Sequence, residues 1–160
     1  MILQASAATD VGMRRRVNED RYALVPDLGL YLVADGMGGH KAGQLASQLA
    51  AEGAVHAVQS LEGESLSLAE KLNEIVAAAN REFFNMAKTH AEYSGMGRTL
   101  VAMLASAGKI AVAHVGDSRA YLIRRGAIRP LTNDLPSLGN CFADKKLRPK
   151  RRSSIHTDTC

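Results

Sequence analysis

The sequence is most informative at residues 30–40, which read Leu30-Tyr31-Leu32-Val33-Ala34-Asp35-Gly36-Met37-Gly38-Gly39-His40. Residues 30–34 form a short continuous apolar run, typical of a buried strand, and the glycines that follow end that strand. A partly buried carboxylate must be paired, hydrogen-bonded or bound to a metal. The stretch therefore predicts a strand that ends in a candidate ligand, Asp35. The alternative is that Asp35 makes an Asx-turn into the glycines.

Two helices are predicted after this strand. From Ala42 to Leu61, leucines and alanines fall on one face of a helical pattern. A second helix is expected to begin at Ser67, because Ser67-Leu68-Ala69-Glu70 matches a capping box. Its apolar residues keep the three-to-four spacing of a core-facing stripe for about five turns.

Short strands are predicted on both sides of the helices, at residues 2–8, 21–25, 99–105, 109–115 and 119–123. Ala107-Gly108 and Arg125-Gly126 separate the later strands in the manner of hairpin turns. Strands, then two consecutive helices, then more strands indicate an α+β fold with an antiparallel sheet.

Composition narrows the class of protein. A chain of 160 residues that is 46% hydrophobic fits one globular domain. No apolar run approaches the roughly 18 residues of a membrane span, and residues 1–10 do not resemble a signal peptide. With only Cys141 and Cys160, the sequence predicts reduced thiols and a cytoplasmic protein.

The net charge of +4 comes entirely from the end of the chain. Residues 1–134 hold 14 basic and 14 acidic residues, whereas residues 135–160 hold six basic and two acidic ones. We interpret 1–134 as the folded part and 135–160 as a basic, disordered tail. Such a tail could attract nucleic acid without sequence specificity. With Phe142 as its only aromatic residue, specific binding is not expected.

Further acidic residues occur near predicted strand ends. Glu19 and Asp20 precede one strand, and Asp117 lies between two others in Gly116-Asp117-Ser118. Carboxylates are the hard oxygen ligands that Mg²⁺ and Mn²⁺ prefer, and the spacing of a zinc site is absent. Taken singly, Asp20 more often caps a turn and Asp117 more often closes a hairpin, and only together do these residues suggest a site.

For two further polar residues, His40 and Arg15, the sequence leaves two interpretations each. The glycines after Asp35 match neither a dinucleotide-binding pattern nor a P-loop. His40 is either a helix-start histidine or a general acid beside a metal carboxylate. Arg15, in Arg14-Arg15-Arg16, is either part of a solvated patch or a phosphate ligand that forms paired hydrogen bonds.

Four blocks of the sequence together resemble the bacterial branch of the metal-dependent protein phosphatases, the protein phosphatase 2C family. The blocks lie within residues 9–20, 33–40, 95–100 and 113–121. The resemblance implies a four-layer α-β-β-α sandwich of two antiparallel sheets flanked by helix pairs. It also implies hydrolysis of phosphoserine and phosphothreonine at a site for two Mn²⁺ or Mg²⁺ ions, with a third, weaker ion.

The resemblance assigns roles residue by residue. Asp35 corresponds to the carboxylate that bridges the two ions, and the carbonyl of Gly36 to a ligand beside it. Glu19 and Asp20 correspond to the acidic pair, with Asp20 acting through water. Arg15 corresponds to the substrate-phosphate ligand and Asp117 to a ligand of the third ion. In this interpretation a water is acidified and attacks phosphorus in line.

The resemblance ends near Asp134. The family pattern continues with two more metal aspartates, in Asp-Gly and Asp-Asn motifs, which residues 135–160 do not contain. The sequence thus predicts a truncated or frameshifted phosphatase domain that is weakly active or inactive. The alternative is a non-catalytic module. The expected partners are phosphoproteins, substrates of a bacterial serine/threonine kinase, and the expected state is a monomer.

Overall fold

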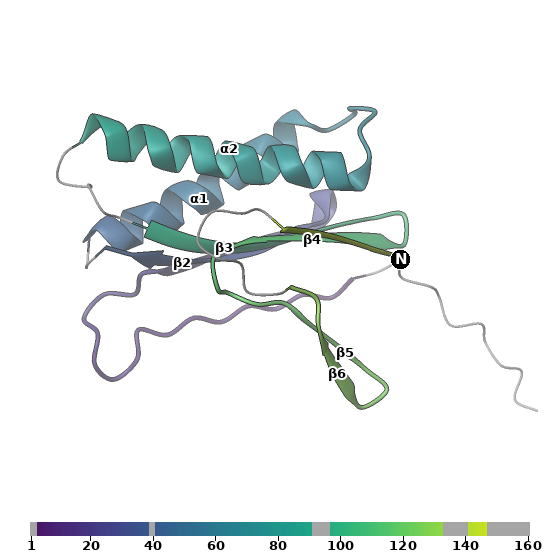
Figure 1. Cartoon of the computed structure of the whole chain (residues 1–160), viewed down its shortest axis with the longest axis horizontal. Helices are drawn as coiled ribbons and strands as arrows, with labels where there is room; N and C mark the ends of the chain where they lie inside the picture. The colour runs from purple at the N-terminus through teal and green to yellow at the C-terminus, as the bar shows by residue number, and fades with distance from the viewer. Residues whose placement is uncertain (1–2, 39–40, 91–96, 133–140, 147–160) are drawn as a thin grey trace, which may run out of the picture.

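The structure is a computed structural model that describes residues 3–38, 41–90, 97–132 and 141–146 (Figure 1). In chain order its elements are β1 (Asp20–Val25), the 3₁₀ helix η1 (Pro26–Leu28), β2 (Leu30–Met37), α1 (Lys41–Ser60), α2 (Leu68–Thr89), β3 (Gly97–Ser106), β4 (Lys109–Val115), β5 (Tyr121–Arg124), β6 (Ala127–Pro130) and β7 (Cys141–Lys146).

The strands form two antiparallel sheets, which confirms the α+β class and the paired-sheet architecture. Five strands form one sheet in the order β1-β2-β3-β4-β7, and β5 and β6 form a two-stranded hairpin. Figure 1 shows α1 and α2 stacked over one side of the larger sheet and the hairpin projecting on the other side. Within the four described ranges, helices cover only that one face.

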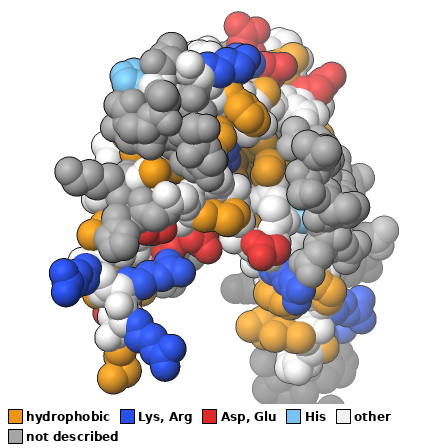
Figure 2. All heavy atoms as spheres, turned by 60° about the vertical axis from the view of Figure 1, so that its left-hand side comes forward, with side chains coloured by type: hydrophobic (Ala, Val, Ile, Leu, Met, Phe, Trp, Pro, Cys, Tyr) orange, Lys and Arg blue, Asp and Glu red, His pale blue; other side chains and the backbone are white. Residues whose placement is uncertain are grey.

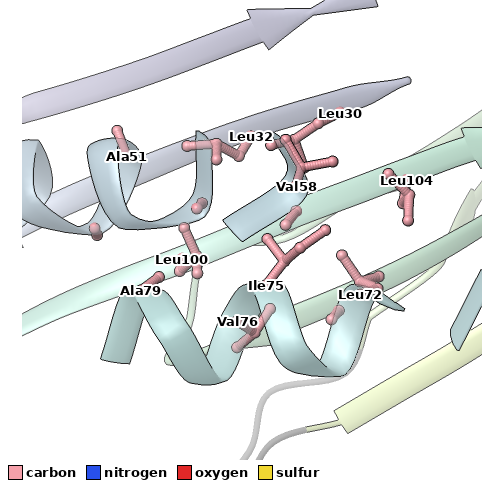
Figure 3. Packing of buried hydrophobic residues seen from close by; sticks show 14 of the residues in the cluster. Leu30, Leu32, Ala51, Val58, Leu72, Ile75, Val76, Ala79, Leu100 and Leu104 are labelled. Atoms are coloured by element: carbon pink, nitrogen blue, oxygen red, sulfur yellow. The ribbon is translucent and has the colours of Figure 1, made fainter. Parts of the chain in front are cut away.

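The alternation of buried and exposed residues along β2 shows which face of the sheet is buried. Leu30, Leu32 and Ala34 are buried toward the helices, whereas Val33 and Asp35 are exposed on the opposite face. Figure 3 shows leucines of β2 and β3 meeting the apolar stripe of α2. Fully buried alanines of α1 let that helix approach the sheet closely. The resulting layer holds the ends of β1, β2 and β3 in a fixed register.

Two local signals in the sequence are confirmed. Ser67 caps α2: the Glu70 N–H donates to its hydroxyl at 3.3 Å, and the Glu70 carboxylate accepts from the Ser67 N–H at 2.8 Å. Both predicted hairpin turns have the left-handed conformation that a tight turn requires, with φ of +48° and +75° at Ala107-Gly108 and +53° and +72° at Arg125-Gly126.

Two predictions about the chain ends are wrong. Residues 3–8 contain no strand and are mostly exposed. Their composition, mainly small and polar, gives a strand little apolar surface to bury. The tail predicted to be disordered forms β7 over Cys141–Lys146, which pairs with β4 from Lys109 to His114. The free backbone groups of an edge strand provide the physical reason, since they accept an added strand independently of its side chains.

The remaining tail, residues 147–160, and the proposed domain boundary at residue 134 lie outside the described residues. The division into 1–134 and 135–160 therefore stays a prediction. Among the helices of the described ranges, none has the length and apolar character that a bilayer crossing requires.

Candidate metal centre

A pair of aspartates lies at one end of the larger sheet. Asp20 on β1 is directly opposite Asp35 on β2, so the two side chains share the face that points away from the helices. Asp20 is held in turn by Asn18, whose Oδ1 accepts from the Asp20 N–H at 2.9 Å and whose Nδ2 donates to Thr9 at 2.8 Å. The pairing of β1 with β2 therefore places the two aspartate side chains together at the centre of the site.

The surroundings of Asp35 raise the pKa of its carboxyl group. Partial burial, then the negative charge of Asp20 and a hydrogen bond between the two carboxyls, raises the pKa of Asp35. The charge of Asp117 raises this pKa further, whereas the Arg15 guanidinium lowers it. Arg15 and Asp117 therefore lie within electrostatic reach of Asp35, although 20 and 82 residues separate them from it in the sequence.

An open cavity of about 390 Å³ lies over the aspartate pair, and its lining includes Asp10, Asp20, Asp35 and Ser118. Figure 2 shows acidic side chains gathered in a hollow of this face, with Lys and Arg side chains on both sides of them. Clustered carboxylates bordered by guanidinium groups can hold a divalent cation and an anionic substrate side by side.

Glu19 lies on the other side of the strand end. Successive residues of an extended chain point to opposite faces, and a Cβ on Gly43 of α1 would lie 2.5 Å from Glu19 Oε2. The Gly36 N–H donates to the Glu19 carbonyl at 3.1 Å. A Cβ on Gly36 would meet the Gly43 carbonyl oxygen at 1.9 Å, so this contact between strand and helix requires two glycines. The Glu19 carboxylate thus lies beside the first turn of α1.

The predicted convergence of three carboxylates is wrong for this structure. Asp20 and Asp35 come together, but no group of three His, Cys, Asp or Glu side chains within the described ranges is arranged to hold an ion. The alternation that turns Glu19 toward α1 is the physical reason. His40, the predicted general acid, lies outside the described residues.

Two hydroxyl residues of the site were not singled out from the sequence. Thr99 of β3 is directly opposite Asp35 on the other side of β2, and its hydroxyl hydrogen-bonds with that of Ser118. Both residues occur in blocks that resemble the family, Gly97-Arg98-Thr99 and Asp117-Ser118-Arg119. Their position within these blocks, near candidate ligands in the sequence, is the signal that could have identified them.

Comparison with known proteins identifies the family. Residues 13–140 match the family described as Protein phosphatase 2C, and this range contains every candidate residue of the site. The chain belongs to the protein phosphatase 2C family. The resemblance stated from the four sequence blocks is thereby confirmed.

Two bacterial phosphatases are among the relatives of this chain. The chain is 32% identical to the serine/threonine protein phosphatase PstP of Mycobacterium tuberculosis, over 96% of this chain and 29% of PstP. It is 35% identical to the serine/threonine phosphatase stp of Listeria monocytogenes, over 82% of this chain and 54% of that protein. The chain therefore spans about half or less of these relatives.

Solved structures of the family have the same fold. The catalytic domain of PstP in complex with two manganese ions superimposes with a TM-score of 0.71 at 36% identity, covering 81% of this chain and 54% of that one. Stp1 of Staphylococcus aureus gives a TM-score of 0.70 at 35% identity, with coverage of 84% and 54%.

Proposed function

We propose that this chain acts in the metal-dependent hydrolysis of phosphoserine and phosphothreonine in proteins. The observation that carries the proposal is the aspartate pair: in a member of this family, Asp20 and Asp35 meet across β1 and β2, with Asp117 and Arg15 in electrostatic reach. Relatives named serine/threonine phosphatase support the substrate class.

The ligand atoms present are of the chemical type that Mn²⁺ and Mg²⁺ prefer. They are hard oxygens, and the raised pKa of Asp35 reflects partial burial together with nearby negative charges, which a cation would offset. Asp20 and Asp35, with the carbonyl of Gly36, would hold an ion, and Asp117 would contribute to a weaker further site. The manganese complex of PstP supports this assignment. Bound cations would supply Lewis-acid activation of water and phosphoryl group.

The other roles belong to the protein itself. The exposed guanidinium of Arg15 would bind the phosphate of the substrate through paired hydrogen bonds. Its charge lies close enough to Asp35 to act on the same site. His40 would protonate the leaving serine or threonine oxygen as a general acid. The site would accept phosphoproteins made by a bacterial serine/threonine kinase, in the cytoplasm.

We further propose that the 160-residue chain is weakly active or inactive by itself. Only Asp20 and Asp35 are in contact, and within the described residues no third acidic side chain completes an ion site. An ion held by few anionic ligands keeps more of its hydration and is bound less tightly. Weak binding therefore limits the acidification of the attacking water.

The test is Mn²⁺ titration by calorimetry together with phosphate release from a phosphothreonine peptide. The wild-type chain should bind Mn²⁺, and Asp35→Asn should remove that binding and any Mn²⁺-dependent phosphate release. Asp27→Asn is the matched control, because Asp27 belongs to η1, at the opposite end of β1 from Asp20. A wild-type chain that binds no Mn²⁺, or an Asp35→Asn chain that binds it equally well, would contradict the metal site.

A further inference from the structure

Thr99 lies between the aspartate pair and the segment that carries Asp117. It is directly opposite Asp35 in the β2–β3 ladder, so its side chain shares the site face. Only 1% of Thr99 is exposed, and its hydroxyl hydrogen-bonds with the hydroxyl of Ser118. Ser118 follows Asp117 directly and lines the cavity over the aspartates. One pair of hydroxyls thus joins β3 to the segment after β4.

The backbone before Asp117 is fixed against the same threonine. Gly116 has a φ of +87°, the left-handed region that favours glycine, and a Cβ there would lie 2.8 Å from Thr99 Cγ2. The chain therefore leaves β4 close to the Thr99 methyl group and returns to the Thr99 hydroxyl two residues later. Gly116 thus lies beside the Thr99 side chain, and Ser118 hydrogen-bonds with it.

The segment is also held further along. The Ala120 N–H donates to the Thr132 hydroxyl at 3.0 Å, and the Ala120 carbonyl accepts from the Leu131 N–H at 2.8 Å. Thr132 is only 5% exposed. These bonds close the base of the β5–β6 hairpin. Asp117 therefore lies in a short segment attached at Thr99 on one side and at Thr132 on the other, and its charge acts on Asp35.

We propose that Thr99 and Ser118 are positioning residues that hold Asp117 toward the Asp20–Asp35 pair. Neither hydroxyl needs to touch an ion or the substrate for this role. The β2–β3 register sets the position of Asp35. Because Thr99 belongs to the same register, it fixes the segment that carries Asp117 relative to Asp35. The consequence for metal binding rests on the proposed function, whereas the ordering of residues 116–118 does not.

The competing explanation is that the two hydroxyls only satisfy each other at a buried position. Loss of such a bond would lower stability wherever it lies. It would leave residues 116–118 ordered, and its effect on Mn²⁺ binding would not depend on Asp117. These differences separate the two explanations.

The experiment uses Thr99→Val, which keeps the methyl contact with Gly116 but lacks the hydroxyl, and Ser118→Ala. Thr99→Ser keeps the hydroxyl but lacks the methyl group, so it should cause a smaller loss than Thr99→Val. Ser47→Ala is the matched control: Ser47 is also fully buried, and its hydroxyl donates to the Gln44 carbonyl within α1. The first readout, made without metal, is the ¹⁵N order parameter of the amides of residues 116–118.

We expect Thr99→Val and Ser118→Ala to lower these order parameters from the rigid range of about 0.85 toward 0.6, while Ser47→Ala leaves them unchanged. The second readout is Mn²⁺ affinity, which should fall about tenfold, as is typical when an outer partner of a metal ligand is lost. In an Asp117→Asn background, Thr99→Val should cause no further loss of affinity.

Two outcomes would overturn the proposal, and a third would separate it from the proposed function. Unchanged order parameters in both hydroxyl variants overturn it. An equal loss of Mn²⁺ affinity with and without the Asp117 carboxylate also overturns it, because the effect then does not pass through Asp117. If residues 116–118 lose order but the wild-type chain binds no Mn²⁺, the positioning role stands and the proposed function fails. Should Thr99→Val not fold, the half-buried Ser118→Ala carries the same tests.

Discussion

At the scale of single residues, the ionisation of Asp35 makes the stability of the fold depend on pH. Its pKa is raised in the folded state by partial burial and by Asp20. An acid whose pKa is raised by folding binds its proton more tightly when folded, so stability falls as pH rises from about 4 through the folded pKa. We expect the melting temperature of wild type to drop across this window relative to that of Asp35→Asn.

The measurement is thermal unfolding of both chains from pH 3 upward, followed by circular dichroism. Asp27→Asn is again the control, because it removes an aspartate that lies away from the pair. It should follow the wild-type curve through the titration of Asp35. A constant difference between wild type and Asp35→Asn at all pH values would show that the two carboxyls do not interact as the structure indicates.

Arg98 is a second residue whose environment is unfavourable to its charge. Its side chain is only 7% exposed, and among the described residues none hydrogen-bonds with its Nε or Nη1. Nη2 donates to Asn80, and the guanidinium lies 5.1 Å from the centre of the Phe83 ring. Burial lowers the pKa of Arg98 to about 10, so it stays charged at neutral pH and its desolvation is only partly offset.

Arg98→Met should therefore stabilise the chain by about 1 kcal/mol, since an apolar side chain of similar length avoids the burial of a charge. Arg98→Ala should destabilise it instead, because the deletion leaves a cavity beside Phe83. Urea unfolding of the two variants gives the comparison. If Arg98→Met loses stability, the guanidinium is more favourably paired than its contacts with Asn80 and Phe83 indicate.

The sequence pointed to acidic residues whose charges the structure brings together, but not to the directions of all their side chains. Asp20, Asp35 and Asp117 were all chosen from strand ends, and the structure brings their charges together. Glu19 was chosen with Asp20 because the two are adjacent. Adjacency in an extended chain places two side chains on opposite faces, and the Glu19 carboxylate accordingly lies against Gly43. Thr99 was missed because its role depends on pairing with Asp35, a contact across 64 residues of sequence.

At the scale of elements, the contact between Gly36 and Gly43 sets how closely α1 approaches the end of β2. A Cβ on Gly43 would lie 2.5 Å from Glu19 Oε2 and 3.1 Å from the Gly36 carbonyl carbon. Gly43→Ala gains about 1 kcal/mol of helix propensity, but its Cβ displaces the Glu19 carboxylate and presses on the Gly36 backbone. We expect a net loss of about 2 kcal/mol, within the range of overpacked sites.

Gly53→Ala is the matched control, because Gly53 lies in the same helix and gains the same propensity. Its added Cβ would meet the flexible Glu82 side chain at 3.1 Å and Ala79 Cα at 3.2 Å. The contact is tight but less severe, so the net change should lie near zero. Equal effects of the two substitutions in chemical unfolding would show that α1 can move away from β2 without cost.

Elements with local signals were predictable, and those without them were not. The capping box at Ser67 and the turns at Ala107-Gly108 and Arg125-Gly126 act through contacts a few residues apart, and each was found where expected. β7 has no such signal, since its pairing depends on the free edge of β4. Residues 3–8 were misjudged because a short run of mostly small residues does not reveal whether a partner strand exists.

At the scale of the whole molecule, the two faces of the larger sheet differ in how completely they are covered. The helix side is closed by α1 and α2, and its leucines are buried. On the other side, Tyr22, Val33 and Met37 keep 43%, 50% and 50% of their surface exposed. The helix-covered layer therefore provides most of the core, whereas the face that carries the aspartates remains open around them.

The β5–β6 hairpin adds a second exposed apolar surface. Ile123 and Ile128 are directly opposite each other on its two strands and are 72% and 64% exposed. Exposed apolar surface of this kind promotes association, so the monomer predicted from the sequence should hold at low concentration and give way to self-association as concentration rises. Replacing both isoleucines by threonine keeps the β-branched shape that strands favour and removes part of the apolar surface.

We expect the Ile123→Thr, Ile128→Thr double variant to remain monomeric at concentrations where wild type associates, as measured by sedimentation velocity. Phe84→Gln is the control, because Phe84 is an apolar residue of α2 that is 52% exposed, on an element that does not contribute to the hairpin. It should leave the association of wild type unchanged. If Phe84→Gln disperses the associated species and the threonine variant does not, the helix layer is the contact surface. A wild-type chain that stays monomeric throughout would show that the isoleucine pair is too small to support association.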